Sequence, residues 1–418
     1  MTNESGRLKV LICAYTCEPD RGSEPGVGWN WAVQAARDHE VWVLTTSERE
    51  LEADGRHKQI PNLHFVYYKL PGWARRLAPS ERLRYLYWQV AVMPAARRLQ
   101  RQIGFDLVHQ LTFISLEAPG LLWSLGVPFV WGPVGGGQAP PRALRSYFRD
   151  VWPVEIARGW RKRLIGLNPL VRIAARRSAW IVASNRDTAR CLDGLTTAPI
   201  VIEPEIGIDA TAAPPSRDEH YGFTIAWAGR LIPRKGPLLA LDVAQALKRR
   251  GVRFRLRMAG DGPWRKLIER EIAQRGLRRE VTIERVSYAG MHGFYGDGDA
   301  FLFTSLQDTN GTVLLEAMAS GLPVVCLDHQ GAADLIGDDC GFKVRVQNKA
   351  QVIEGMATAL AELADDRGLR ERLGENGRRR VGERYTWELK REFIARLYQR
   401  VATRSHAAAT PQLVEATR

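Results

Sequence analysis

Two carboxylates and the start of a helix stand close together in residues 303–325, FTSLQDTNGTVLLEAMASGLPVV. Asp308 lies in a polar turn after an apolar run that predicts a buried strand, and Glu316 follows eight positions later inside a predicted helix. A helix start presents free N–H groups and the positive end of the helix dipole, which suit a phosphate. The residues at this start are Asn310, Gly311 and Thr312. Because a carboxylate further along the helix can accept hydrogen bonds from sugar hydroxyls, the segment predicts a nucleotide-sugar site.

These residues resemble the E-x7-E segment of the family-4 retaining glycosyltransferases, which are group 1 glycosyltransferases with the two-domain GT-B fold. Asp308 stands at the position of the first glutamate and Glu316 at that of the second. The first carboxylate is therefore one methylene shorter here than in the family. The resemblance runs from about Lys9 to about Val401 and is strongest in the C-terminal half. It implies that Glu316 holds the donor ribose and that Asp308 contacts the donor sugar.

A second motif, AGRLIPRKGP at residues 228–237, follows another predicted strand. Arg230 and Lys235 are five positions apart in a loop bounded by glycines, among them Gly229, so both cations can reach one pocket. Two cations beside a diphosphate stabilise it as a leaving group without a metal ion. The resemblance implies this role for both residues, and two solvated cations are the alternative.

Further donor contacts are implied by the resemblance in two places. Gly260 and Asp261 form a tight turn after a strand, and in the family such a turn borders the nucleotide. A plain strand-to-helix turn explains Asp261 equally well. Arg285 and Val286 stand where family members hold the base through backbone groups.

The N-terminal half contributes two glycine-rich loops. Residues 21–28, RGSEPGVG, precede a predicted helix but do not form a G-x-G-x-x-G fingerprint, so a dinucleotide site is not supported. We expect Gly26 and Gly28 to let the backbone approach a donor phosphate or an acceptor. Residues 132–137, GPVGGG, form a second loop over the same site. The predicted acceptor-binding residues are Glu24, Gly136 and Gly137; a surface carboxylate is an equally good interpretation of Glu24.

His109 is predicted to end the strand DLVHQ and to point toward the cleft. A lone histidine is more often structural than catalytic. The segment resembles the D-[IL]-V-H motif of the family, which implies that His109 positions the sugar or the acceptor.

The chain has 418 residues, which suits two domains of about 200 residues each. Short apolar runs alternate with amphipathic stretches, the signature of parallel α/β domains. The expected strands are residues 9–15, 41–46, 64–68, 106–110, 129–131 and 179–184, then 224–227, 253–258, 281–284, 300–303 and 324–327. The predicted fold class is α/β, with two Rossmann-like doubly wound domains facing an interdomain cleft. The expected divisions are an acceptor-binding domain at 1–205, a nucleotide-sugar-binding domain at 206–384, a helix at 385–402 that crosses back to the first domain, and a flexible tail at 403–418.

The formal net charge of +14 favours anionic partners. Two basic stretches stand out, residues 73–101 (Trp73 to Arg101) and residues 158–177 (Arg158 to Arg177). Basic helices with interleaved aromatic residues suit an anionic membrane surface. The alternative is that these are ordinary solvated helix faces. The five scattered cysteines favour a reducing compartment, and the N-terminal apolar run is too short for a signal peptide. We therefore expect a cytoplasmic protein, with contact at the inner face of the cell membrane left open.

The predicted function is transfer of a sugar, with retention, from a nucleotide-sugar donor to a glycan or lipid-linked acceptor, in cell-envelope or exopolysaccharide synthesis. No cofactor or metal is expected, because no His, Cys or Asp cluster has ligand spacing. A GT-B sugar-nucleotide epimerase is one alternative. A non-catalytic basic protein that binds anionic lipid or RNA is another, although no RNA-recognition motif is present and no nucleic acid is expected.

Overall fold

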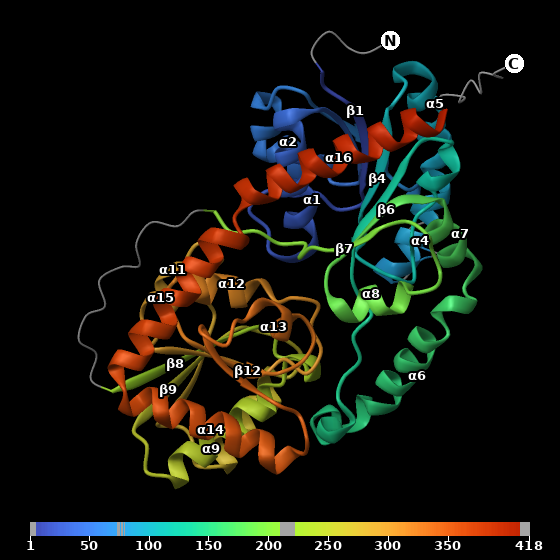
Figure 1. Cartoon of the computed structure of the whole chain (residues 1–418). Helices are drawn as coiled ribbons and strands as arrows, with labels where there is room; N and C mark the ends of the chain where they lie inside the picture. The colour runs from blue at the N-terminus through green and yellow to red at the C-terminus, as the bar shows by residue number, and fades with distance from the viewer. Residues whose placement is uncertain (1–5, 73–75, 77, 79, 210–221, 410–418) are drawn as a thin grey trace, which may run out of the picture.

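The computed structural model describes residues 6–72, 76, 78, 80–209 and 222–409, which form two parallel sheets with helices on their faces (Figure 1). The first sheet has the order β3-β2-β1-β4-β5-β6-β7, and the second has the order β10-β9-β8-β11-β12-β13. The predicted fold class, two doubly wound α/β domains, is confirmed. Trp73, Arg75 and the tail beyond residue 409 lie outside the described residues.

The first domain contains seven strands and the helices that connect them. Its strands are β1 Lys9–Ala14, β2 Glu40–Thr45, β3 Leu63–Tyr67, β4 Leu107–Thr112, β5 Phe129–Val134, β6 Ser178–Ala183 and β7 Ile200–Ile202. Its helices are α1 Ser23–Asp38, α2 Glu48–Asp54, η1 Arg56–Gln59, α4 Glu81–Ala91, α5 Met93–Ile103, η2 Leu122–Leu125, η3 Arg142–Val151, α6 Trp152–Arg163, η4 Ile165–Leu167, α7 Pro169–Arg177 and α8 Arg186–Leu192.

The second domain repeats the same architecture. Its strands are β8 Phe223–Ala228, β9 Phe254–Ala259, β10 Val281–Glu284, β11 Ala300–Phe303, β12 Val324–Leu327 and β13 Gly341–Val344. Its helices are η5 Pro233–Lys235, α9 Pro237–Arg249, α10 Arg265–Gln274, α11 Met291–Gly296, α12 Thr312–Ala319, α13 Gln330–Leu335, α14 Lys349–Asp365 and α15 Arg367–Arg384, followed by α16 Trp387–Ala409.

Sequence patterning located the central strands because parallel strands covered on both faces are nearly continuous apolar runs. Every residue of β4, β5 and β8 is buried. The two edge strands β7 and β13 were not predicted. Each is only three or four residues long and partly exposed, so neither has the apolar run that marks a central strand.

Helix α16 lies along the first domain, against α1 (Figure 1). Its buried side chains Ile394, Leu397 and Tyr398 belong to the apolar cluster that also contains Trp31 of α1. The helix continues to Ala409, so the expectation of a flexible tail from residue 403 is wrong as far as residue 409. The polar, alanine-rich sequence there has little core to bury, but alanine favours the continuation of a helix that is already formed.

A segment from the N-terminal half packs on the second domain. Leu144, Tyr147 and Phe148 of η3 belong to the apolar cluster beneath the second sheet. The Tyr147 hydroxyl also donates a hydrogen bond to Asp242 of α9 at 2.6 Å. Helix α6 then leads back to the first domain (Figure 1), so the chain crosses between the domains more often than a single boundary at residue 205 describes.

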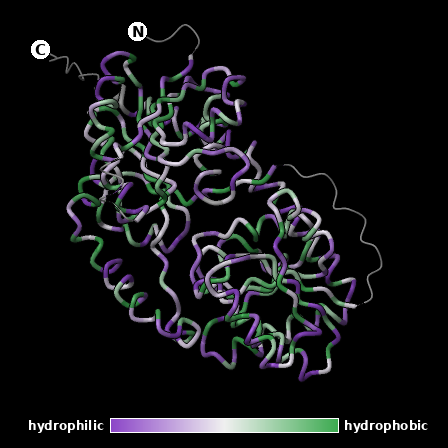
Figure 2. Tube along the Cα trace, turned by 180° about the vertical axis from the view of Figure 1, so that it is seen from behind, coloured by the Kyte–Doolittle hydropathy of each residue, from purple (hydrophilic) through white to green (hydrophobic). Residues whose placement is uncertain are grey.

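No helix among the described residues is long and apolar enough to cross a bilayer. The most hydrophobic residues run through the interiors of both domains (Figure 2).

Tyr398 is expected to stabilise the attachment of α16 through His109. The Tyr398 hydroxyl lies 2.6 Å from His109 Nδ1, and His109 Nε2 bonds the carbonyl oxygen of Gly132. Because a carbonyl only accepts, Nε2 carries the proton and Nδ1 accepts from Tyr398. Tyr398→Phe leaves that buried nitrogen without a donor, so we expect a loss of about 1–3 kcal/mol, measured as a lower thermal midpoint.

The matched control is Tyr87→Phe, because Tyr87 is 48% exposed and its replacement should change stability by less than about 0.5 kcal/mol. Equal thermal midpoints for the two variants would show that the Tyr398–His109 bond contributes nothing.

Candidate active site

A pocket of ≈ 240 Å³ lies where the two domains meet the segment that joins them. Its walls come from the start of α1, residues 206–209, residues 288–295, α12 and the start of α16. Both Thr312 and Glu316 line it. The start of α12 and the carboxylate within it therefore open into one cavity, as the sequence pattern predicts.

Glu316 is half-buried and is oriented by Tyr295, whose hydroxyl donates a hydrogen bond to Glu316 Oε2 at 2.8 Å. Burial raises the pKa of the Glu316 carboxyl, and the Tyr295 hydrogen bond opposes that rise. Tyr295 itself is 1% exposed and packs between Phe294 and Phe301. The carboxylate is thus fixed toward the pocket by a rigid aromatic neighbour.

Gly311 is required at the start of α12. Its φ is 81°, a left-handed conformation, and a Cβ there would lie 2.9 Å from the Phe303 ring. The same position would be 3.5 Å from Asp308 Oδ2. The turn thereby places Asp308 directly beside the helix start that reaches the pocket at Thr312.

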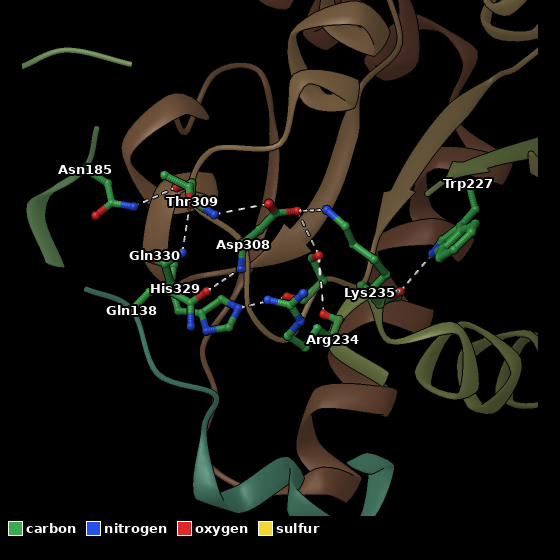
Figure 3. A network of polar contacts seen from close by, with 11 residues as sticks. Gln138, Asn185, Trp227, Arg234, Lys235, Asp308, Thr309, His329 and Gln330 are labelled. Carbon is green, nitrogen blue, oxygen red and sulfur yellow. Dashed lines mark hydrogen bonds and ion pairs between the residues drawn. The ribbon is translucent and has the colours of Figure 1, made fainter. Parts of the chain in front are cut away.

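Lys235 and Asp308 form an ion pair, although they are 73 residues apart in sequence (Figure 3). Lys235 follows β8 and Asp308 follows β11, and these strands are neighbours in the parallel sheet. Their carboxyl ends meet at one edge, which brings the two side chains together. Asp308 Oδ2 also accepts a hydrogen bond from the Ser305 hydroxyl at 3.0 Å, and the Asp308 amide donates to Gln330 Oε1 at 2.9 Å.

Arg230 lies in the same loop as Lys235, and its side chain is exposed. Gly229 has a φ of 157°, and its carbonyl oxygen would be 2.0 Å from a Cβ on Gly260, so the two loops touch through their backbones. This close approach explains Gly260 without a ligand, and the positive φ explains Gly229. The glycines that mark these two loops in the sequence are therefore explained in part by the packing of the loops on each other.

Asp261 and Arg285 pair with one another, at 2.8 Å between Arg285 Nη2 and Asp261 Oδ2. Both are exposed, and neither lines the pocket. Val286 packs partly against the apolar cluster that contains α12. The loops after β9 and β10 are thus joined by a surface ion pair, a contact that is usually weak.

In the first domain, the expected loop at 21–28 is wrong beyond residue 22, because α1 begins at Ser23. Gly26 and Gly28 lie inside α1, where a Cβ would come within 1.9 Å of Arg21 O and 2.3 Å of Thr16 O. Glycine there allows the helix to pack on the preceding loop. Gly26 also lines the pocket, and Gly28 does not.

Glu24 bonds its own domain instead of facing an acceptor site. Its Oε1 accepts a hydrogen bond from the backbone amide of Ile114, in the loop that follows β4. Burial raises the pKa of Glu24 to about 7; the Ile114 bond lowers it and the nearby charge of Glu205 raises it further. The sequence suggested that Glu24 is either an acceptor ligand or a surface carboxylate. A largely buried carboxyl that accepts a hydrogen bond from the Ile114 amide fits neither interpretation.

The glycine loop after β5 contacts the second domain. Gly137 packs against α8, where a Cβ would lie 2.5 Å from Thr188 Cα, and Gly136 has a left-handed φ of 99°. The next residue, Gln138, donates a hydrogen bond to the Thr309 hydroxyl at 2.9 Å (Figure 3). Gly136 and Gly137 therefore shape the loop within the first domain, and Gln138 makes the contact with the second domain.

Asn310 serves the same contact. It is 1% exposed, and its Nδ2 donates to Ser184 O at 3.0 Å and to the Glu205 carboxyl. The Asn310 side chain is thus directed at the first domain and not at the pocket, which corrects its predicted role in donor binding.

His109 does not end its strand and does not point into the pocket. Strand β4 continues to Thr112, and the His109 side chain is fully buried between Tyr398 and Gly132. Burial lowers the pKa of His109 to about 4, so the ring is neutral near pH 7. The predicted role in positioning sugar or acceptor is replaced by a structural one.

Several pocket residues were missed because no local motif marks them. They are Asn30, Tyr288, Met291, His292, Tyr295 and Trp387, together with residues 206–209. They come from α1, the segment between the domains, the loop before α11, α11 itself and α16, and only tertiary packing brings them together.

Residues 215–380 match the family model of the group 1 glycosyl transferases. Two curated relatives are an alpha-D-kanosaminyltransferase from Streptomyces kanamyceticus, 32% identical over 44% of this chain and 48% of the relative, and the putative colanic acid biosynthesis glycosyltransferase WcaL from Escherichia coli, 30% identical over 38% and 42%. The chain thus matches less than half the length of these relatives. The predicted similarity to group 1 glycosyltransferases is confirmed.

A solved structure, Anabaena HepE in complex with UDP-glucose, superposes with a TM-score of 0.57 at 16% identity, covering 96% of this chain and 100% of that one. At this identity the likeness establishes the fold. The two facing α/β domains therefore have the GT-B fold.

Glu24 is expected to make stability depend on pH. Its folded-state pKa of about 7 lies above the ordinary value of 4.5, so its contribution is complete below about pH 4.5 and is lost as the pH rises through 7. Glu24→Gln removes this loss while an amide oxygen still accepts from Ile114. Relative to the wild type, the variant should gain up to about 3 kcal/mol between pH 5 and pH 8, measured by denaturant unfolding at both pH values.

Glu383→Gln controls for the loss of one exposed carboxylate. A difference between Glu24→Gln and the wild type that stays constant with pH would contradict the burial of an ionisable Glu24.

Proposed function

We propose that this protein is a retaining glycosyltransferase that moves a sugar from a nucleotide-sugar donor to a glycan or lipid-linked acceptor. The observation that carries the proposal is the continuous run from Lys235 and Asp308, past the start of α12, to Glu316 in the pocket. The group 1 family model covers all of these residues. A relative whose name refers to colanic acid biosynthesis favours a role in cell-envelope polysaccharide synthesis.

In this proposal the second domain binds the donor. The Glu316 carboxylate accepts hydrogen bonds from the ribose hydroxyls, and Tyr295 keeps it in place. The amides at Gly311 and Thr312 donate to the diphosphate, at the positive end of the α12 dipole. The UDP-glucose bound by Anabaena HepE supports a nucleotide sugar as the donor class.

The cations after β8 would stabilise the leaving group. As the bond between the anomeric carbon and the diphosphate oxygen breaks, negative charge grows on that oxygen, and Lys235 and Arg230 offset it without a metal ion. The acceptor oxygen bonds the anomeric carbon on the same face, which retains the configuration. The acceptor proton passes to the departing phosphate, so no pair of catalytic carboxylates is required.

The acceptor would bind on the side of the first domain, at the inner face of the cell membrane. We propose a peripheral contact with anionic lipid through the basic stretches 73–101 and 158–177, of which Trp73 and Arg75 lie outside the described residues. Such a contact would supply a lipid-linked acceptor.

Glu316→Gln is expected to weaken nucleotide binding. The substitution keeps the shape of the side chain but removes a charged acceptor, which corresponds to about 1.5–3 kcal/mol, or roughly 10- to 100-fold in affinity. Thermal shifts with UDP, GDP, ADP and dTDP would identify the preferred base, and calorimetry would then compare the variants.

The control is Glu362→Gln on the exposed surface of α14, which should bind as the wild type does. If no nucleoside diphosphate stabilises the wild type, or if Glu316→Gln binds equally well, the proposed donor site is wrong.

Lys235→Met is expected to slow the chemical step more than it weakens donor binding. Loss of one preorganised donor to a developing negative charge typically lowers kcat by about 10²–10³-fold. Slow hydrolysis of the preferred nucleotide sugar would give kcat and KM. The control is Lys266→Met, an exposed lysine of α10. A proportional rise in KM with unchanged kcat would contradict a role in stabilising the leaving group.

A further inference from the structure

Exposed apolar side chains gather on one part of the first domain. Among the described residues, thirteen large hydrophobic side chains are exposed, and eleven of them lie in two short ranges, 83–90 and 154–173. They are Leu83, Leu86, Tyr87, Val90, Val154, Ile156, Trp160, Leu164, Leu167, Leu170 and Ile173. Scattered exposed hydrophobic residues need no explanation, but a concentrated group marks an interaction surface.

Helix α4 carries two apolar stripes on opposite faces. Tyr85 and Trp88 are fully buried against the first sheet. The second stripe, Leu83, Leu86, Tyr87 and Val90, has the spacing of one helix face and is exposed. Since the inner stripe already supplies the core contact, the outer one is available to another partner.

The run from α6 to α7 has the same character. Trp160, Leu164 and Leu167 follow one another at helical spacing, and Leu167 is 71% exposed, the highest value in this group. Hydrophobic and hydrophilic residues alternate along α6 (Figure 2). On the inner side, Ile165 and Val171 pack into the same cluster as Tyr85 and Trp88. Helix α4, η4 and α7 therefore pack on the first domain, and α6 leads up to them with its apolar side chains exposed.

Glu117 joins the two segments. Its carboxylate pairs with Arg82 of α4 and, at 3.7 Å, with Arg161 of α6. The outer stripes of α4 and of α6, η4 and α7 thus form one surface, the lateral face, composed of the eleven residues named above and the cations between them. Figure 1 shows α4, α6 and α7 on the same flank of the molecule.

Cations surround the apolar residues of the lateral face. Residues 158–177 hold seven arginines and lysines and no acidic residue. Arg161, Arg172 and Arg176 are exposed, and the Arg163 guanidinium lies 5.6 Å from the Trp160 ring centroid. Long basic side chains beside leucine and tryptophan suit the boundary between anionic headgroups and acyl chains.

We propose that the lateral face docks on an anionic lipid bilayer, with its leucine, isoleucine and tryptophan side chains inserted below the headgroups. Cations outnumber the carboxylates Glu81, Glu117 and Glu155 on this face. The excess positive charge favours this occupant over a second copy of the chain, because two such faces in contact would place mostly cations opposite cations. The proposal deepens the proposed function, on which it rests for the lipid-linked acceptor. The proposed function invokes only attraction between the basic stretches and anionic lipid. The present proposal adds insertion of the apolar side chains of the lateral face into the bilayer.

Vesicle flotation tests the docking directly. The full chain is mixed with vesicles of phosphatidylcholine alone or of equal parts phosphatidylcholine and phosphatidylglycerol. The wild type should float with the anionic vesicles and remain bound in part at high salt, because insertion is not screened. The double variant Trp160→Ser, Leu164→Ser should partition about tenfold less well. Arg172→Gln with Arg176→Gln should bind less at low salt and lose its salt dependence in part.

The matched control is Ile202→Ser, since Ile202 is 43% exposed but lies in β7, outside the lateral face. It should float as the wild type does, and circular dichroism with thermal melting should show that every variant is folded. Failure of the wild type to float, or equal flotation of the Trp160, Leu164 variant, overturns the proposal. So does light scattering that shows a dimer which this variant dissociates, because the face then binds a second copy.

The nucleoside-diphosphate thermal shift separates the two proposals. If the shift occurs and flotation fails, only membrane docking is wrong; if flotation succeeds without any shift, the donor site is wrong and the docking surface stands.

Discussion

The loop between β11 and α12 is hydrogen-bonded by both domains, and the arrangement of the site depends on it. On its own side, the carbonyl oxygen of Arg234 accepts from the amides of Leu306 at 2.7 Å and Gln307 at 3.1 Å. From the first domain, Asn185 Nδ2 donates to Thr309 O at 2.8 Å. Buried backbone groups require partners; the first domain supplies one for the Thr309 carbonyl, and the second domain supplies one for the amides of Leu306 and Gln307. The turn that carries Asp308 is therefore bonded by both domains, while Asp308 itself bonds Lys235, Ser305 and Gln330 of the second domain.

Asp308, whose side chain is one methylene shorter than the glutamate expected from the resemblance, forms an ion pair with Lys235. Both side chains are largely shielded from water, at 25% and 18% exposure, so each charge needs a counterpart. In the proposed reaction a phosphate at the start of α12 would supply that counterpart to Lys235. Asp308 would then be released beside Gly311, next to the sugar that the phosphate carries. Donor binding would thus replace Asp308 by phosphate as the partner of Lys235, and the same step would free the Asp308 carboxylate.

The sequence could predict much of the second domain and less of the first. Strands β10, β11 and β12 were predicted to the residue, because each is a short apolar run between clear turns. The position of Glu316 at the pocket was predicted from a pattern within one helix. Its partner Tyr295 was not predicted, because the two residues are 21 positions apart in different helices and only tertiary packing joins them.

The same limit explains the errors at His109 and Glu24. The family resemblance suggested a positioning role for His109, and the glycine-rich loop at 21–28 suggested an acceptor contact for Glu24. Which way a side chain points depends on the neighbouring elements, here α16 for His109 and the loop after β4 for Glu24. Glycine was ambiguous for a related reason. It permits close approach of any backbone, and at Gly28 and Gly260 the approaching backbone belongs to the protein itself.

The loop after β4 connects the pocket side of the first domain to the lateral face. At its start, Ile114 is bonded to Glu24 in the first turn of α1, whose neighbour Gly26 lines the pocket. Near its end, Glu117 is paired with α4 and α6. The loop follows the carboxyl end of a central parallel strand, the edge where ligands of such sheets bind. In the membrane-docking proposal, residues 113–117 therefore connect the docked face with α1, the helix whose start lines the pocket.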